Sequence, residues 1–335
     1  MSVNSLGDLA RAFALRQQNT NLKLEIQKLN KELATGMATD LADHLGGSYA
    51  RLTGIEHDLR LRDGYSVMIA EAEQFTELMQ SRLDQINDIS TDFARDLIAA
   101  DASNSSVTSD TLATEGRLQF ETVVSMLNSQ AAGRTMFGGD ATDRAALLGG
   151  DLILAELETV VAGATTAADI ESALDSWFAS PTGFQSFAYT GGTGGLAPFQ
   201  ISEDTSVDAS IRADDQVLKD VLKSLASAAL ANAPGTSLSK AEQSGLFRIS
   251  GEGLLTTERE LIISQAKIGL AQEQISKASV RNQVEISALE LAKGSLLKVD
   301  PFEAASELEA AQFQLESLYA VTVRLSQLSL VNFLR

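Results

Sequence analysis

Residues 254–296, LLTTERELIISQAKIGLAQEQISKASVRNQVEISALELAKGSL, carry the longest regular pattern in the chain. A leucine, isoleucine or asparagine recurs there at every seventh position: Leu254, Leu261, Ile268, Ile275, Asn282, Leu289 and Leu296. An apolar repeat of seven residues is typical of a helix that packs lengthwise against another helix, and one polar position can fix the register of the pair. The stretch therefore predicts a single helix about 60 Å long, at 1.5 Å per residue.

The N-terminal segment shows the same spacing. Leu15, Leu22 and Leu29 fall seven residues apart, and Ile26 and Leu33 occupy the offset positions of the repeat. Asn19 is a polar residue at one of these offset positions, and Gly36 ends the pattern. The segment therefore predicts a helix that ends near Gly36 and has one polar position in its apolar seam.

A third stripe lies at the C-terminal end. The pair Asp300-Pro301 is a good helix start, because proline fits the first turn and aspartate can cap it. Apolar residues then follow on one side of the expected helix and continue to Leu334. A freely solvated segment is rarely so apolar, so we expect a partner. The expected assembly residues on the two terminal stripes are Leu15, Leu22, Ile26, Leu29, Leu33, Leu308, Leu315, Leu318, Leu325, Leu328, Leu330 and Phe333.

The region between these stripes mixes helices with short strands. Apolar residues at steps of three and four predict helices, and a turn is expected at residues 102–106. The expected helices are Ile55–Arg62 leading into Met68–Ala100, Leu112–Ala132, Asp151–Gly163, Ala167–Phe178 and Asp215–Ala231. The expected strands are Phe184–Tyr189, Phe199–Ser202 and Val207–Ile211, with a flexible turn at Thr190–Gly195 between the first two.

Together these patterns predict a mainly α fold. N- and C-terminal helices pair into an elongated coiled-coil bundle, and a small α+β insert domain occupies the middle. Three domains are expected: residues 1–40 with 300–335 as terminal paired helices, 41–140 with 250–299 as a helical rod, and 141–249 as the insert. The heptads alone fit an ordinary helical bundle core equally well, because they specify packing and not purpose.

Composition excludes several classes of protein. The net charge is −19, and residues 101–256 hold 20 acidic but only 8 basic side chains, which argues against nucleic-acid binding. The chain has no cysteine, so it has no disulfide and no thiolate metal site. No apolar run of about 18 residues predicts a membrane span, and no cleavable secretory signal is visible.

The residues of acid–base and metal chemistry are scarce. The histidines are His44 and His57, 13 residues apart, whereas a helical zinc site has its ligands four apart. The Gly191–Gly195 stretch lacks the lysine of a phosphate-binding loop and is expected to be a hairpin turn. Two Gly-Gly-Asp triplets, at residues 138–140 and 149–151, are expected to be turns, the second capping a helix. We expect no enzyme activity, no metal and no cofactor.

Several motifs resemble the flagellin family. The segment Glu32-Leu-Ala-Thr-Gly36 is similar to the end of the first helix in that family. The segment LNSQAAGRTMFGGD, residues 127–140, resembles one found in the family's hook-associated protein 3 branch. Similar resemblances occur at Tyr189–Gly195 with residues 199–207, at Gln312–Tyr319 and at Leu325–Leu330. They cover roughly residues 5–140, 185–215 and 255–335, although Thr39–His44 departs from the Pro- and Asp-rich stretch usual there.

The resemblance implies a structural subunit of the bacterial flagellum at the junction of hook and filament. It would be exported unfolded by the flagellar secretion apparatus, without a cleaved signal, and its terminal segments would become ordered only on assembly. Its implied partners are copies of itself in a ring or helical assembly, other hook-associated proteins, flagellin and an export chaperone. A filament flagellin is one alternative, favoured by the terminal Leu334-Arg335 pair, and a cytoplasmic coiled-coil scaffold is another.

Overall fold

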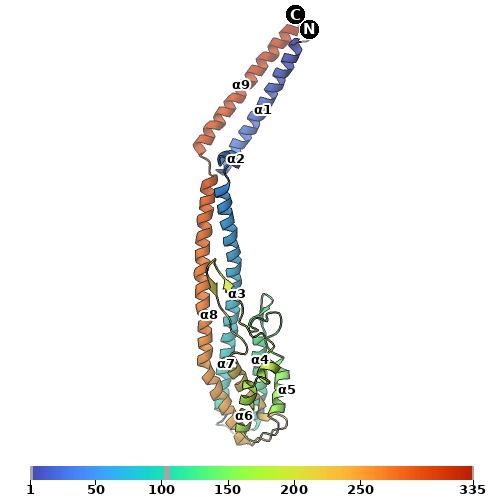
Figure 1. The fold of residues 1–335 in the computed structure, drawn as a ribbon, viewed down its shortest axis with the longest axis vertical. Helices are drawn as coiled ribbons and strands as arrows, with labels where there is room; N and C mark the ends of the chain where they lie inside the picture. Colours follow the sequence, from blue (N-terminus) through green and yellow to red (C-terminus); the bar gives the residue numbers. More distant parts are fainter. Residues whose placement is uncertain (1–2, 102–105, 334–335) are drawn as a thin grey trace. The chain divides into compact units, whose positions relative to one another are not determined.

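The structure is a computed structural model that describes residues 3–101 and 106–333, with side chains described at 10–99, 109–325 and 327. It is mainly helical, as predicted (Figure 1). Its elements in chain order are α1 (Val3–Thr35), α2 (Leu41–His44), α3 (Ala50–Asp101), α4 (Ser106–Leu127), β1 (Gln130–Ala131), β2 (Arg134–Thr135), α5 (Gly150–Val160), α6 (Ala167–Ala179), η1 (Phe184–Ala188), β3 (Phe199–Gln200), β4 (Ser206–Val207), α7 (Gln216–Ala229), η2 (Leu230–Asn232), α8 (Lys240–Leu297) and α9 (Pro301–Phe333).

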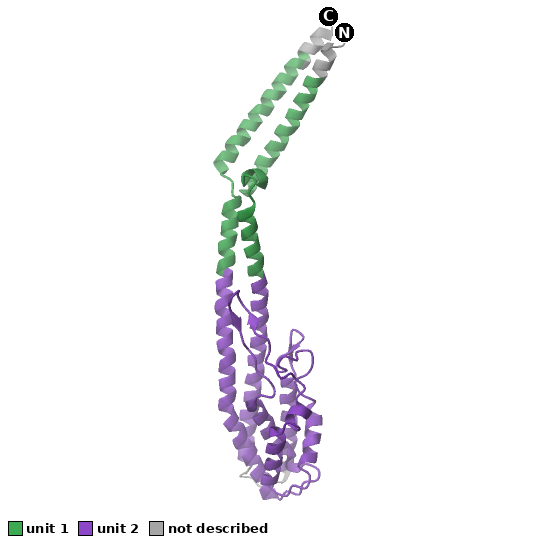
Figure 2. Ribbon diagram, viewed as in Figure 1, with its two compact units in different colours: residues 1–63, 284–335 green, residues 64–283 purple. Residues whose placement is uncertain are grey.

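The chain divides into two compact units (Figure 2). The first unit combines residues 1–63 with residues 284–335, and the second contains residues 64–283. The three domains predicted from the sequence divide the chain more finely, and their boundaries stay a prediction. Among the described residues, no helix has an apolar stretch long enough to cross a membrane.

In the first unit, α1 and α9 lie side by side, so the two ends of the chain pair as predicted. The sequence also predicted correctly where α1 ends and where α9 begins. Thr35 is the last residue of α1, and Gly36 follows it with a positive φ of 70°, a conformation that favours glycine. Asp300 precedes α9, and its carboxylate accepts a hydrogen bond from the N–H of Phe302 at 2.8 Å.

In the second unit, the apolar ladder of α8 is buried. Leu254, Leu261, Ile268 and Ile275 are each at most 1% exposed. Helices α4 and α7 pack against each other at very close range, since a Cβ on Gly116 of α4 would lie 2.9 Å from the backbone nitrogen of Ala229. The predicted apolar face of residues 68–100 is likewise in the core, and α3 runs through both predicted helical stretches without a break.

The second unit contains two small antiparallel sheets, of which only the second lies within the predicted insert. Strand β1 pairs with β2, with Gln130 opposite Thr135, and β3 pairs with β4, with Phe199 opposite Val207. The β1–β2 hairpin ends α4 at Leu127, five residues before the predicted end at Ala132. The predicted turn at residues 102–106 falls mainly on residues 102–105, which lie outside the described part of the chain, and Ser106 begins α4.

The prediction of a strand at Phe184–Tyr189 was wrong. Residues 184–188 form a short π-helical turn, and only Tyr189 makes a bridge, to Leu147. The reason is aromatic packing: the rings of Phe184 and Phe187 lie 6.0 and 6.4 Å from Trp177. Residues three apart point to opposite faces of a strand but to the same side of a helical turn.

Two related predictions need correction. The strands expected at Phe199–Ser202 and Val207–Ile211 are each only two residues long, at 199–200 and 206–207. Strand β4 ends because the carboxylate of Asp208 accepts a hydrogen bond from the N–H of Ser210 at 2.8 Å, which turns the chain. The loop at residues 190–195 is therefore no hairpin between two strands, since a helical turn precedes it.

Candidate assembly surface

The seam between α1 and α9 buries part of each predicted stripe. On α1, Leu22 and Leu29 are 5% and 3% exposed, and Leu15 and Ile26 are half-buried. On α9, Leu318 is 8% exposed, and the half-buried residues are Leu308, Leu315 and Leu325. The structure thus brings these positions together along one helix pair. The side chains of Leu328, Leu330 and Phe333 lie outside the described part of the structure.

Leu33 does not lie in the seam. Its side chain is 43% exposed, whereas the neighbouring Glu32 is only 6% exposed. Glu32 is buried because its carboxylate accepts a hydrogen bond from the N–H of Thr39 at 2.7 Å, just after the helix ends. The heptad could not predict this exchange, since it depends on the path of the chain beyond Gly36.

The polar position of α1 has a partner on α9. The side chains of Asn19 and Lys23 on α1 lower the pKa of Tyr319 on α9, because both can donate hydrogen bonds to its phenolate oxygen. The sequence indicated that Asn19 could fix register but did not identify Tyr319. A polar contact at one level of an apolar seam opposes sliding of one helix along the other.

Large apolar side chains remain exposed on the paired terminal helices. Phe302 and Phe313 of α9 are 83% and 71% exposed, and Phe13 and Leu24 of α1 are 68% and 59% exposed. Sequence analysis missed these residues because they lie outside the heptad positions. Pairing of α1 with α9 therefore leaves apolar surface on both helices that this chain does not cover.

Helix α8 carries a second ladder on its outer side. Ile263, Leu270, Val284 and Leu291 are 52%, 61%, 63% and 76% exposed. They fall on one seven-residue repeat, two positions after the buried ladder, with Lys277 at the intervening site. Scattered exposed apolar residues are normal on soluble proteins, but a regular repeat is typical of a helix face that packs on something. The spacing was visible in the sequence and was overlooked beside the buried ladder.

The two connections next to the α1–α9 pair are joined by backbone hydrogen bonds. Met37 and Lys298 form an antiparallel bridge. The N–H of Ala38 donates to the carbonyl of Leu297 at 2.9 Å, and the N–H of Val299 donates to the carbonyl of Gly36 at 3.1 Å. Residues 36–40 and 298–300 thus form one joint, at which both chain segments leave their helices together.

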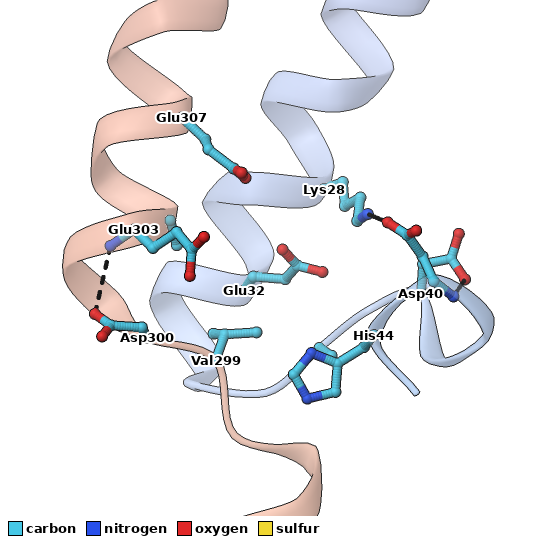
Figure 3. Close-up of a pocket in the computed structure, with 11 residues that line it drawn as sticks. Lys28, Glu32, Asp40, His44, Val299, Asp300, Glu303 and Glu307 are labelled. Atoms are coloured by element: carbon cyan, nitrogen blue, oxygen red, sulfur yellow. Dashed lines mark hydrogen bonds and ion pairs between the residues drawn. The ribbon is translucent and has the colours of Figure 1, made fainter. Parts of the chain in front are cut away.

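An acidic pocket of about 250 Å³ lies at this joint (Figure 3). Asp300, Glu303 and Glu307 line it from the start of α9, and Glu32 projects into it from α1. Two basic residues also line it: Lys28 lies 3.8 Å from the carboxylate of Asp43, and the imidazole of His44 contacts the carbonyl of Leu296 at 3.1 Å. Within the described ranges, no three side chains are grouped as metal ligands.

In the second unit, the segment 127–140 folds as a tight structural element. Ala132 and Gly133 both have positive φ, 50° and 76°, which makes the two-residue turn suited to a β-hairpin. The side chain of Asn128 donates to the carbonyl of Leu147 at 2.9 Å and accepts from its N–H at 2.8 Å. The residues of this motif therefore have folding roles.

Arg134 connects this hairpin to two other elements. Its guanidinium lies 2.8 Å from the carboxylate of Glu71 on α3. The same group lies 5.9 Å from the ring centre of Phe75 and 5.7 Å from that of Phe199 on β3. An ion pair and two cation–π contacts thus hold β2, α3 and β3 together.

The glycine-rich loop wraps around the second part of the same motif. The carboxylate of Asp140 accepts a hydrogen bond from the N–H of Gly194 at 3.2 Å, and the hydroxyl of Tyr189 donates to the carbonyl of Gly192 at 2.8 Å. A Cβ on Gly192 would overlap the carboxylate of Asp140, and one on Gly194 would lie 2.6 Å from it. The glycines permit this close approach and bind no phosphate in this arrangement, because an acidic side chain fills the loop.

The chain matches a protein family over part of its length and is similar to solved structures. Residues 258–334 match the family described as the bacterial flagellin C-terminal helical region. No curated protein sequence matches the chain. A solved structure from Vibrio parahaemolyticus, provisionally described as a flagellar hook-associated protein, is 15% identical with a TM-score of 0.42, covering 73% of this chain and 92% of that one.

Proposed function

We propose that this chain, whose residues 258–334 belong to the bacterial flagellin C-terminal helical region family, is a hook-associated subunit that links hook to filament. It is a flagellin-family structural protein of the flagellum and not an enzyme. The family match covers α8 from Glu258 onward and the whole described part of α9, two of the helices that carry exposed apolar residues.

The uncovered apolar surface is the observation that carries an assembly role. Val284 and Leu291 on α8 and Phe302 and Phe313 on α9 are each more than 60% exposed within the folded chain. Burying an apolar side chain of this size stabilises a complex by about 1.5–3 kcal/mol. A lattice of identical subunits would cover such residues at every contact, so polymerisation supplies the stability that the single chain lacks.

The junction role in particular rests on the segment 127–140, which resembles that of hook-associated proteins. Its Arg134 lies against Phe199, and its Asp140 is hydrogen-bonded to the loop at 190–195. A filament flagellin would share the paired terminal helices, so the choice between the two roles depends on this segment and on the number of copies per flagellum.

The proposed route to the flagellum is export of the unfolded chain, followed by folding at the growing end. The absence of cysteine suits this route, because no disulfide can form before or during transit. The α1–α9 pair is only two helices thick, and such a pair buries too little area to be stable alone, so neighbouring subunits would complete it. Its partners would be further copies, other hook-associated proteins, flagellin and an export chaperone.

Truncation after Pro301 tests the proposal. Removing α9 eliminates Phe302, Phe313 and the seam with α1 together. We expect cells with hooks but without attached filaments, and filament subunit lost to the medium. Normal filaments on such cells would contradict the junction role.

Immunoelectron microscopy with an antibody to the second unit separates the remaining possibilities. A single spot where hook meets filament is the expected result. Label along the whole filament would instead identify a flagellin, and label confined to the cytoplasm would identify a scaffold. A scaffold also requires strong hydrogen-exchange protection at residues 15–33 and 308–330 in the free monomer, which the proposal does not expect.

A further inference from the structure

Two helical glycines in the first unit have no packing role within the chain. A Cβ placed on Gly54 of α3 or on Gly294 of α8 would meet nothing within 4 Å, and neither residue has a positive φ. Glycine in a helix is less favourable than alanine, because it loses more backbone freedom on folding. Neither close packing nor backbone geometry therefore accounts for glycine at these positions.

Some helical glycines of the second unit provide a contrast, although Gly64, Gly245 and Gly269 also meet nothing within 4 Å. A Cβ on Gly116 would lie 2.9 Å from backbone, one on Gly251 would lie 2.9 Å from the side chain of Ile98, and one on Gly253 would lie 2.6 Å from the hydroxyl of Ser224. Each of these glycines lets two helices approach closely. Gly54 and Gly294 have no such neighbour.

The two glycines lie at the same level of the α3–α8 pair. Within the first unit, Arg62 pairs with Glu285 at 2.9 Å and Lys293 pairs with Glu56 at 2.8 Å. In an antiparallel pair, these contacts place residue 54 opposite residues 293–295. Gly54 and Gly294 therefore match to within one residue, or about 1.5 Å along the helix axis.

The packing at this level is uneven. Leu52 of α3 is 6% exposed, but the α8 ladder positions Leu289 and Leu296 are only half-buried, unlike the ladder residues of the second unit. An ion pair of Glu56 with Lys293 joins the helices close to this level, and its side chains are 36% and 35% exposed. Exposed ion pairs between long side chains hold helices weakly, and few buried apolar contacts mean low local stability.

We propose that the level of Gly54 and Gly294 is a bending point at which α3 and α8 deform together. It lies beside the joint formed by residues 36–40 and 298–300, in the second turn of α3 and the last turn of α8. Bending there changes the direction of both helices without breaking the α1–α9 seam. The property belongs to the single chain and does not depend on the junction role.

Hydrogen exchange of the full-length monomer tests the proposal through Gly54→Ala. Alanine should raise amide protection at residues 54–60 about two- to fivefold, the range of the glycine-to-alanine difference in a helix. If both helices open together, protection at residues 290–297 of the unchanged α8 should rise as well. Gly294→Ala should give the reciprocal result, and the double variant should exceed either single change.

The matched control is Gly269→Ala on α8. Gly269 also meets nothing within 4 Å, but no glycine occupies its matching level on α3. Its substitution should raise protection around residue 269 and leave residues 50–60 unchanged. A response to Gly54→Ala confined to α3, or equal protection of wild-type amides at this level and one turn away, would overturn the proposal.

Discussion

The side-chain amide of Asn282 donates a hydrogen bond to the hydroxyl of Ser66 over 2.7 Å, which links α8 to α3 inside the second unit. Asn282 is the polar member of the α8 ladder and is 5% exposed. A buried polar side chain among apolar ones favours the single register in which its partner is opposite. Asn282 with Ser66, like Asn19 with Tyr319, therefore sets how two long helices align.

Replacing Asn282 by Ala should lower the free energy of unfolding by about 1–3 kcal/mol. A buried hydrogen bond is lost, and the hydroxyl of Ser66 loses its donor. Ser66→Ala should do the same more weakly. The double variant should lose less than the sum of both, with a coupling of about 0.5–1.5 kcal/mol by urea denaturation. Ser276→Ala, at an exposed position of α8, is the control. Additive losses would show that the pair does not interact.

The contribution of Arg134 to stability should depend on the shape of its side chain as well as on its charge. Arg134→Ala should cost about 1–2 kcal/mol, from an exposed ion pair and two cation–π contacts. Arg134→Lys keeps the charge but loses the planar group that lies near Phe75 and Phe199, so it should recover less than half of that loss. Denaturation followed by the fluorescence of the single Trp177 measures both. Full recovery by lysine would assign the stability to the ion pair with Glu71 alone.

The long helices were predictable from sequence because their signal repeats many times. Seven heptad positions of α8 fall on one face, so the prediction of a helix does not depend on any single one of them. The helix ends were predictable at Gly36 and Pro301 because those residues have strong local preferences. The fold class and the pairing of the ends follow from these features.

The insert was less predictable because its conformation depends on contacts distant in sequence. Phe184 and Phe187 are as suited to a strand as to a helix, and the position of Trp177 decides between them. The loop at residues 190–195 takes its shape from Asp140, about 50 residues earlier, which no local pattern indicates. For the same reason, the burial of Glu32 in place of Leu33 was not predicted.

Two glycine substitutions should act in opposite directions. Gly192→Ala should destabilise the second unit by more than about 2 kcal/mol, because its Cβ would overlap the carboxylate of Asp140. Gly245→Ala on α8 meets nothing within 4 Å and should stabilise by about 0.5–1 kcal/mol. Thermal unfolding of both variants tests this difference. A tolerated Gly192→Ala would mean that the loop relaxes away from Asp140.

Glu171 should make the second unit less stable as the pH rises. Burial raises the pKa of Glu171 above its ordinary value of 4.5, although the Ser227 hydroxyl and the charge of Lys223 oppose this effect. A group with a raised folded-state pKa contributes its full stability below the unfolded-state pKa and loses it as pH rises through the folded-state pKa. Glu171→Gln should therefore be more stable than wild type at pH 7, with a difference that shrinks towards pH 4. Equal stability at both values would contradict the shift.

A charge in the terminal seam should block assembly and spare the rest of the chain. Leu22 is 5% exposed, so Leu22→Asp would bury an unpaired carboxylate between α1 and α9. We expect polymerisation to need a protein concentration at least about tenfold higher, equivalent to about 1.4 kcal/mol per subunit. Leu325→Asp should act in the same way, since Leu325 is half-buried in that seam. Trp177, buried in the second unit, should keep its native fluorescence in both variants.

Gln27→Asp is the control for Leu22→Asp. Gln27 is exposed on the same helix, and its substitution adds the same charge. It should polymerise and support motility as wild type does. If Leu22→Asp also behaved as wild type, the α1–α9 seam would not be an assembly element. If both variants failed, charge on α1, and not burial of Leu22, would be responsible. Only failure of Leu22→Asp with normal behaviour of Gln27→Asp assigns assembly to the apolar seam itself.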